Sequence, residues 1–137
     1  MKLYLAARYA RRWEMMARTQ ELEKEGHVVT ARWVKDGHDK RDAMQDTYAR
    51  EDLEDILAAE AIICFTDDPE ARPTTGGSSG GRHVELGIAL GINAMIDAWE
   101  PRRPLRILVV GWKQNVFHYL PNVEYFDIFP KAKAALK

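Results

Sequence analysis

Short apolar runs recur along the chain, separated by longer segments of mixed polarity. Five of these runs are predicted strands: residues 2–7, 27–33, 61–65, 106–110 and 123–126. Runs this short and this apolar are typical of strands buried on both faces, as in a parallel sheet. Strands that alternate with helical segments favour right-handed crossovers and a three-layer α/β fold. We therefore predict a Rossmann-like or flavodoxin-like parallel sheet with strand order 2-1-3-4-5.

The segments between the runs predict four helices. They span residues 8–25, 48–59, the stretch that follows the glycines of 76–81, and 128–136, and Gly26 would end the first. Their inner faces are expected at Ala10, Trp13, Met16 and Ala17; at Leu53, Ile56 and Leu57; and, in the third helix, on two neighbouring stripes, Val84, Ile88, Gly91, Ile92 and Met95 on one and Ala89, Ile92 and Ile96 on the next. Residues 35–47 predict a mobile connection with at most one helical turn, and residues 111–121 an irregular, aromatic-rich segment.

Composition narrows the class of protein. The 137 residues are expected to form one domain over residues 1–137. A net charge of −1 gives no basic excess for nucleic-acid binding, so no nucleic-acid partner is predicted. No apolar segment reaches the length of a membrane span, so we expect no membrane partner and a cytoplasmic protein. The single cysteine, Cys64, lies in an apolar run and is predicted to be a buried structural thiol.

A loop rich in glycine and serine, residues 76–81, leads directly into the third predicted helix. Glu85 is expected in the first turn of that helix, where free backbone N–H groups and the helix dipole would keep its carboxylate ionised. A glycine loop that runs into a helix is also a favourable anion-binding site, and Gly81 is one of the glycines whose N–H group could point at a ligand. Glu85 is thus a candidate nucleophile at the ligand crevice, although a glutamate at a helix start can also serve only to complement the dipole.

Three further side chains are candidates for the same crevice. Tyr4 lies in the first predicted strand, and it is either a core tyrosine or a group that orients a carboxylate. Asp52 falls in the first turns of the second helix, where an acidic residue is also common as a helix-start charge. Ser79 lies in the glycine loop, whose N–H groups suit a phosphate. One carboxylate as nucleophile and a second as acid or base suit cleavage at an anomeric carbon.

Other motifs are informative mainly by their absence. The four histidines show no metal-ligand spacing, so neither a metal nor a cofactor is predicted. The sequence lacks a Walker motif, a G-x-S-x-G elbow and a G-x-G-x-x-G loop after the first strand, which disfavours the corresponding chemistries. Arg8, Arg11 and Arg12 follow the first strand, and they are either surface charges or groups that attract a 5′-phosphate.

The sequence resembles the nucleoside 2-deoxyribosyltransferase superfamily, which includes 2′-deoxynucleoside 5′-monophosphate N-glycosidases. The motifs that carry the resemblance are Leu3-Tyr4-Leu5-Ala6, Asp52-Leu53 ahead of the third strand, and Glu85-Leu86-Gly87. The resemblance implies that Glu85 attacks the anomeric carbon, that Asp52 contacts the deoxyribose and assists the departing base, and that Tyr4 positions the nucleophile. It also implies that Ser79 contacts a 5′-phosphate, as the serine at this position does in the nucleotide-cleaving branch. The transferases often carry an aspartate there instead, which binds the sugar 5′-hydroxyl.

The resemblance further implies a homodimer or higher homo-oligomer, in which Asn115 in the segment 111–118 contacts base or phosphate in the neighbour's site. The predicted function is cleavage or transfer of the N-glycosidic bond of a 2′-deoxyribonucleoside or its 5′-monophosphate, through a glycosyl-enzyme intermediate on Glu85. Two alternatives remain open. One is a phosphoribohydrolase of modified nucleoside monophosphates, whose usual G-G-x-G-T pattern is missing here, and the other is a non-catalytic nucleotide-binding module.

Overall fold

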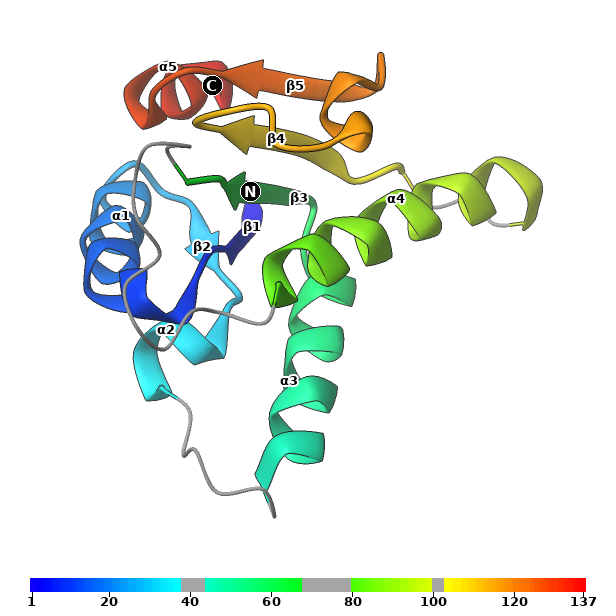
Figure 1. Cartoon of the computed structure of the whole chain (residues 1–137). Coiled ribbons are helices and arrows are strands. Elements are labelled where there is room, and N and C mark those ends of the chain that lie inside the picture. The colour runs from blue at the N-terminus through cyan, green and yellow to red at the C-terminus, as the bar shows by residue number, and fades with distance from the viewer. Residues whose placement is uncertain (38–43, 68–79, 100–102) are drawn as a thin grey trace.

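Five parallel strands form one sheet in the order β2-β1-β3-β4-β5 (Figure 1). The computed structural model describes residues 1–37, 44–67, 80–99 and 103–137. The strands are β1 (Lys2–Ala6), β2 (Val28–Val29), β3 (Ala61–Phe65), β4 (Arg106–Val110) and β5 (Val123–Phe126). The predicted fold class and strand order are confirmed. Because the strands are parallel, their carboxyl ends share one edge of the sheet, where ligands bind in folds of this kind.

Helices cover both faces of the sheet. Within the described residues they are α1 (Arg12–Lys24), α2 (Arg32–Asp36), α3 (Gln45–Leu57), α4 (Gly81–Trp99) and α5 (Phe129–Ala135), with 3₁₀ helices η1 (Tyr9–Arg11) and η3 (Val116–Tyr119). Helices α1 and α5 contact each other, since Lys133 Nζ lies 3.3 Å from Glu21 Oε2. Helix α4 packs on β1, β3 and β4 and against α3. Right-handed crossovers place these two helix pairs on opposite faces.

The central strands form a dry core. Every residue of β3 is buried, and residues 3–6 of β1 have no exposed surface. This is what their unbroken apolar runs predict. Cys64 belongs to this core, and burial raises the pKa of its thiol to about 12. The thiol is therefore structural and unreactive, as predicted.

The second predicted strand is too long. β2 ends after two residues, and α2 begins at Arg32. Trp33 lies on this helix and is buried, and its indole N–H donates a hydrogen bond to the Leu5 carbonyl at 2.9 Å. An edge strand pairs with a neighbour on one side only, so a short β2 leaves few backbone hydrogen bonds unmade. The helical turn of α2 buries the Trp33 rings and brings the indole N–H to its acceptor. The expectation of a strand through residue 33 is therefore wrong.

The helices form close to where they were predicted, but their buried faces differ. The residues predicted inside and found exposed are Ala10, Trp13, Ala17, Leu53, Leu57, Val84, Gly91 and Met95. The residues buried instead include Met15, Thr19, Leu22, Asp55, Leu86 and Asn93. Polar groups can be buried when they are paired. The Asn93 amide, for example, bonds to the Leu105 N–H and carbonyl at 2.8 and 2.9 Å.

Parts of two predicted segments lie outside the described residues. They are 38–43, within the predicted mobile connection, and 68–79, which includes Ser79 and most of the glycine loop. The rest of that connection is more helical than predicted, since α2 extends to Asp36 and α3 begins at Gln45. Among the described helices, none combines the length and the hydrophobicity needed to cross a membrane.

Gly111, directly after β4, is expected to be intolerant of any side chain. Its φ is 115°, and a Cβ there would lie 2.6 Å from Thr66 Oγ1. Gly111→Ala should lower the free energy of unfolding by about 3 kcal/mol, because backbone strain and a clash add together. Gly26 also has a positive φ, of 86°, but no described atom within 4 Å of a Cβ. Gly26→Ala should therefore cost only about 1 kcal/mol. Urea unfolding compares the two variants, and equal losses would contradict the expectation.

Candidate active site

Tyr4, Asp52 and Glu85 are far apart in the sequence and meet on one face of the sheet. The Tyr4 hydroxyl, on a fully buried residue of β1, donates to Glu85 Oε1 at 2.7 Å. Helix α4 packs across β1 and β3, which brings Glu85 to Tyr4. Asp52 lies on α3, which packs against α4, and it lines the same cavity as Glu85. The structure thus brings together the three side chains that the sequence marks as catalytic candidates.

Glu85 lies in the second turn of α4, which begins at Gly81, so the prediction of a first-turn glutamate is wrong. Burial raises the pKa of Glu85 to about 7. The hydrogen bond from Tyr4 and the charge of Arg82 act in the opposite direction, whereas the Asp52 carboxylate raises the pKa. The prediction was that the helix dipole controls the ionisation of Glu85. In the structure, burial has the largest effect on its pKa.

Asp52 lies towards the middle of α3 and not in its first turns. Burial raises its pKa to about 6, while the Tyr4 hydroxyl favours the ionised form. The pKa of Tyr4 is itself raised by burial and by both carboxylates, so its hydroxyl stays protonated and acts as a donor. Two neighbouring carboxyls with raised pKa values titrate as a pair and are typical of functional sites.

An ion pair fixes the part of α3 that carries Asp52. The Asp55 carboxylate accepts hydrogen bonds from the Arg32 backbone N–H and from its Nε, both at 2.8 Å. The Asp55 carbonyl also accepts a bond from Thr30 Oγ1 at 2.9 Å. These bonds tie α3, one turn beyond Asp52, to the start of α2. The sequence analysis did not identify this pair, and an acidic residue one turn after Asp52 was the signal that could have found it.

A cavity of about 360 Å³ lies between α3 and α4. It is lined by Ala49, Asp52, Leu53, Gly81, Val84, Glu85 and Ile88. Its apolar wall explains why Leu53 and Val84 are exposed although both were predicted to be core residues. Apolar walls with two convergent carboxyls suit a small ligand that has an apolar ring face and polar substituents, such as a sugar. Gly81, a predicted substrate contact, is part of this lining.

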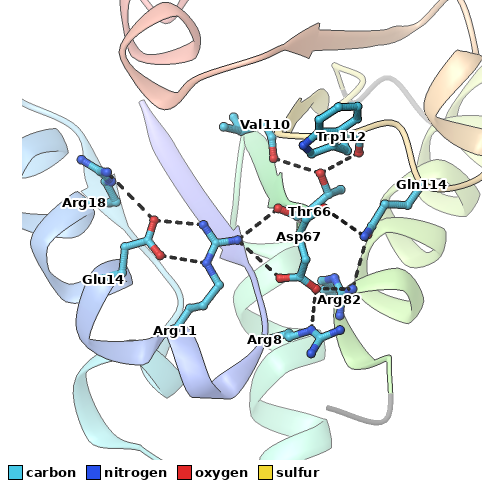
Figure 2. A network of polar contacts seen from close by, with 10 residues as sticks. All are labelled: Arg8, Arg11, Glu14, Arg18, Thr66, Asp67, Arg82, Val110, Trp112 and Gln114. Atoms are coloured by element: carbon cyan, nitrogen blue, oxygen red, sulfur yellow. Dashed lines mark hydrogen bonds and ion pairs between the residues drawn. The ribbon is translucent and has the colours of Figure 1, made fainter. Parts of the chain in front are cut away.

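Arg8 belongs to a polar network at the carboxyl edge of the sheet (Figure 2). Its Nε lies 2.5 Å from Asp67 Oδ2, and Arg11 and Arg82 contact the same carboxylate. Asp67 follows β3, Arg8 follows β1, and Arg82 lies at the start of α4. The sequence analysis missed Asp67 and Arg82. An acidic residue two positions after a central parallel strand, at the edge where ligands bind, was the available signal for Asp67.

Asn115 does not line the cavity that holds Glu85 and Asp52. It caps η3, with its Oδ1 accepting from the Phe117 N–H at 3.0 Å. Its amide nitrogen lies 3.5 Å from His83 Nδ1 and 3.4 Å from His118 Nε2. Asn115 lines a second cavity, of about 800 Å³, that borders a different face of α4. In the part of the chain that the structure describes, no three His, Cys, Asp or Glu side chains are grouped so as to hold a metal ion.

Comparison with known proteins supports the fold. No protein-family model matches the chain, and no curated protein matches it. Among solved structures, the chain is similar to the CMP N-glycosidase BcmB of Clostridium botulinum, with a TM-score of 0.57 and 19% sequence identity. The match covers 99% of this chain and 98% of that one. At this level of identity the similarity shows a shared fold, which agrees with the fold that the sequence resemblance implies.

Removing the Tyr4 hydroxyl should make Glu85 harder to ionise. Tyr4→Phe keeps the ring but loses the hydrogen bond that favours the Glu85 carboxylate, so the pKa should rise above about 7. A hydrogen bond to a charged group contributes about 1.5–3 kcal/mol, which corresponds to an upward move of about one pH unit or more. NMR titration of ¹³C-labelled glutamate carboxyls measures the midpoint, with Glu85→Gln identifying the resonance.

The matched control for this titration is Tyr125→Phe. Tyr125 donates its hydroxyl to the Gly111 carbonyl, so this variant also removes one hydroxyl hydrogen bond. It should leave the Glu85 midpoint unchanged. A Glu85 midpoint in Tyr4→Phe that stays in place or falls would contradict the assigned role of the hydroxyl.

Proposed function

We propose that this protein cleaves or transfers the N-glycosidic bond of a 2′-deoxyribonucleoside or its 5′-monophosphate, through a glycosyl-enzyme intermediate on Glu85. The observation that carries the proposal is the pairing of Glu85 and Asp52 in one cavity, with the Tyr4 hydroxyl 2.7 Å from Glu85 Oε1. Cleavage at an anomeric carbon commonly uses two carboxyl groups, one as nucleophile and one as acid and base, whose surroundings shift their pKa values. The likeness in fold to a CMP N-glycosidase adds support for a nucleotide.

In the first step a Glu85 carboxylate oxygen attacks the anomeric carbon, and the bond from that carbon to the base nitrogen breaks. The leaving base takes the electron pair of that bond and a proton from Asp52. The transition state resembles an oxocarbenium ion, which the neighbouring carboxylate stabilises. Tyr4 supports this step because its hydrogen bond stabilises negative charge on Glu85. With a pKa of about 7 for Glu85 and about 6 for Asp52, a proton shared by the pair lies mainly on Glu85 in the free protein, so the form with the proton on Asp52 is the less populated, reactive one.

In the second step the ionised Asp52 removes a proton from a water molecule or from a second base. This acceptor attacks the anomeric carbon and releases Glu85 as a carboxylate. The raised pKa of about 6 suits Asp52 to both tasks, since such a group gains and loses a proton near neutral pH. The chain's own residues therefore supply every proton transfer, and no cofactor is needed.

For the phosphate of a nucleotide, we assign Arg8 and the backbone N–H groups around Gly81. Arg8 carries a positive charge at the carboxyl edge of the sheet, and Gly81 opens α4 beside Glu85. A helix start with an adjacent guanidinium is a favourable place for an anion. Ser79 is assigned to the same phosphate on the basis of the sequence resemblance.

We further propose that a second copy of the chain packs on the face formed by α4 and η3. The cavity of about 800 Å³ on this face is lined largely by apolar groups, including Leu86, Leu90 and Phe117. Val116 is 76% exposed and Phe117 56% exposed beside it. Exposed apolar groups gathered around a concave face are typical of an interface. Such packing would bring Asn115 of one chain towards the other chain, as the resemblance implies.

The reaction is tested by incubating the protein with nucleosides and 5′-monophosphates, in ribo and deoxy forms, and measuring free base. Glu85→Gln should lower base release by about 10⁴-fold or more, because the nucleophile is lost. Asp52→Asn should lower it by about 10²- to 10⁴-fold. Asp46→Asn, an exposed carboxyl on the same helix, is the control and should be unaffected.

Each outcome of this assay has a separate meaning. Release of base from deoxynucleoside monophosphates at lower KM than from nucleosides supports the nucleotide form of the proposal. Release only from modified ribonucleoside monophosphates would indicate a phosphoribohydrolase. Release from no substrate would indicate a non-catalytic nucleotide-binding module, and activity of Glu85→Gln within a few-fold of the parent would remove Glu85 from the mechanism.

Self-association is tested by light scattering at micromolar concentration, where the parent should have the mass of at least two chains. Phe117→Glu should shift the protein towards the mass of one chain, because a charge would be placed in the apolar contact. Trp13→Glu is the control, since Trp13 is 72% exposed on α1, which lies on the other side of the sheet. A monomeric parent that is fully active would contradict the proposal.

A further inference from the structure

Three guanidinium groups converge on one carboxylate at the carboxyl edge of the sheet (Figure 2). Asp67 Oδ2 lies 2.5 Å from Arg8 Nε and 2.9 Å from Arg82 Nη2, and Asp67 Oδ1 lies 3.8 Å from Arg11 Nη1. The arginines come from the loop after β1, from η1 and from the start of α4. Asp67 is therefore the point at which separate segments of this edge are joined.

The positive charge in this cluster exceeds the negative charge that the described residues provide. Arg11 has a second carboxylate, Glu14, at 2.8 and 2.9 Å. Arg8 and Arg82 share Asp67 alone among the described carboxylates. Among the described residues, one carboxylate lies within ion-pair distance of both guanidiniums, which leaves this group of three side chains with an excess of positive charge.

Arg82 is also short of hydrogen-bond acceptors. It is only 5% exposed, and its Nε is buried without a hydrogen-bond partner among the described residues. Its Nη2 reaches Asp67 and, at 3.4 Å, Gln114 Oε1. A guanidinium has five N–H donors, and leaving a buried one unsatisfied is costly. Arg82 therefore has a buried N–H donor without an acceptor among the described residues.

The position of the cluster connects it to the candidate active site. Arg82 precedes Glu85 by three residues on α4, which is about 4.5 Å along the helix axis. Arg8 follows β1, which carries Tyr4. The Arg8 side chain is 24% exposed and that of Asp67 13%, so the cluster opens to solvent on the Arg8 side.

We propose that Asp67 is the built-in counter-ion of a phosphate site formed by Arg8 and Arg82. In the free protein Asp67 holds the two guanidiniums in place, and a phosphomonoester dianion binds the same N–H groups in competition with it. Asp67 therefore preorganises the site and at the same time limits how tightly phosphate binds. The inference rests on the proposed function in one respect, namely that the phosphomonoester is the 5′-phosphate of the substrate and of the sugar phosphate product.

The physical basis is the geometry and charge of the two anions. Phosphate and carboxylate both accept paired N–H donors from guanidinium, but the phosphate dianion carries twice the charge and more acceptor oxygens. Asp67→Asn keeps the size of the side chain and removes its charge. Two guanidiniums would then face each other without an anion, which destabilises the free protein until phosphate takes the place of the carboxylate.

The test is calorimetric titration of inorganic phosphate into the full chain at constant ionic strength. Asp67→Asn should bind phosphate about tenfold or more tightly than the parent, and phosphate should raise its melting temperature more than that of the parent. Asp55→Asn is the matched control, because it also removes an aspartate that is paired with an arginine. It should lose stability without gaining affinity for phosphate. Equal affinities of Asp67→Asn and the parent, or an equal gain in Asp55→Asn, would overturn the proposal.

A second variant keeps the proposal testable if Asp67→Asn fails to fold. Arg8→Gln should weaken phosphate binding by about tenfold, whereas Arg50→Gln, 77% exposed on α3, should not change it. Unchanged binding in Arg8→Gln would overturn the site. 2-Deoxyribose 5-phosphate should compete with inorganic phosphate, and failure to compete would contradict the link to the substrate. Because the readout is binding, a negative result here leaves the proposed reaction untouched.

Discussion

The hydrogen bond between Tyr4 and Glu85 is the interaction on which the candidate site depends. Tyr4 lies on β1, which has strands on both sides and α4 across its face, and the residue is fully buried, so its hydroxyl has no access to water. A buried hydroxyl needs a partner, and a buried carboxyl needs a donor. The Tyr4 hydroxyl donates to Glu85, so each group provides the hydrogen-bond partner that the other lacks. This bond fixes how α4 lies across β1.

Holding Glu85 in this position has a cost for folding. Its pKa is raised from 4.5 to about 7 in the folded chain, so the protonated form is the one that the fold favours. The contribution of this group to stability is fully present below pH 4.5 and is lost as the pH rises through 7. In the proposed mechanism the ionised form attacks the substrate, so the form that the proposal requires is the less stable one.

The sequence was sufficient to predict the sheet but not the details of its helices. The strands from 61 and 106 are continuous apolar runs, and only a buried parallel strand suits such a run. Helix α4 is apolar on several faces, so its sequence does not reveal that Leu86 faces the core and Val84 a cavity. The meeting of Tyr4, Asp52 and Glu85 was predicted because a known family carries these residues in matching motifs.

Contacts between distant polar residues were beyond the reach of sequence patterns. Asp67 and Arg82 are 15 positions apart, and the structure alone shows that Asp67 pairs with both Arg82 and Arg8. The Arg32 pair with Asp55 is of the same kind, since it joins two helices that no sequence pattern indicates as neighbours. Charged residues occur throughout such a chain, and only the fold selects the few that act on each other.

The burial of Cys64 has a practical consequence. The chain contains one cysteine, that residue has no exposed surface, and its pKa of about 12 leaves almost no thiolate at neutral pH. Reagents that modify thiols should therefore leave the folded protein unlabelled. A cysteine introduced at an exposed position would be the only reactive thiol, so a fluorophore or spin label can be attached at one chosen point without first altering the interior of the sheet.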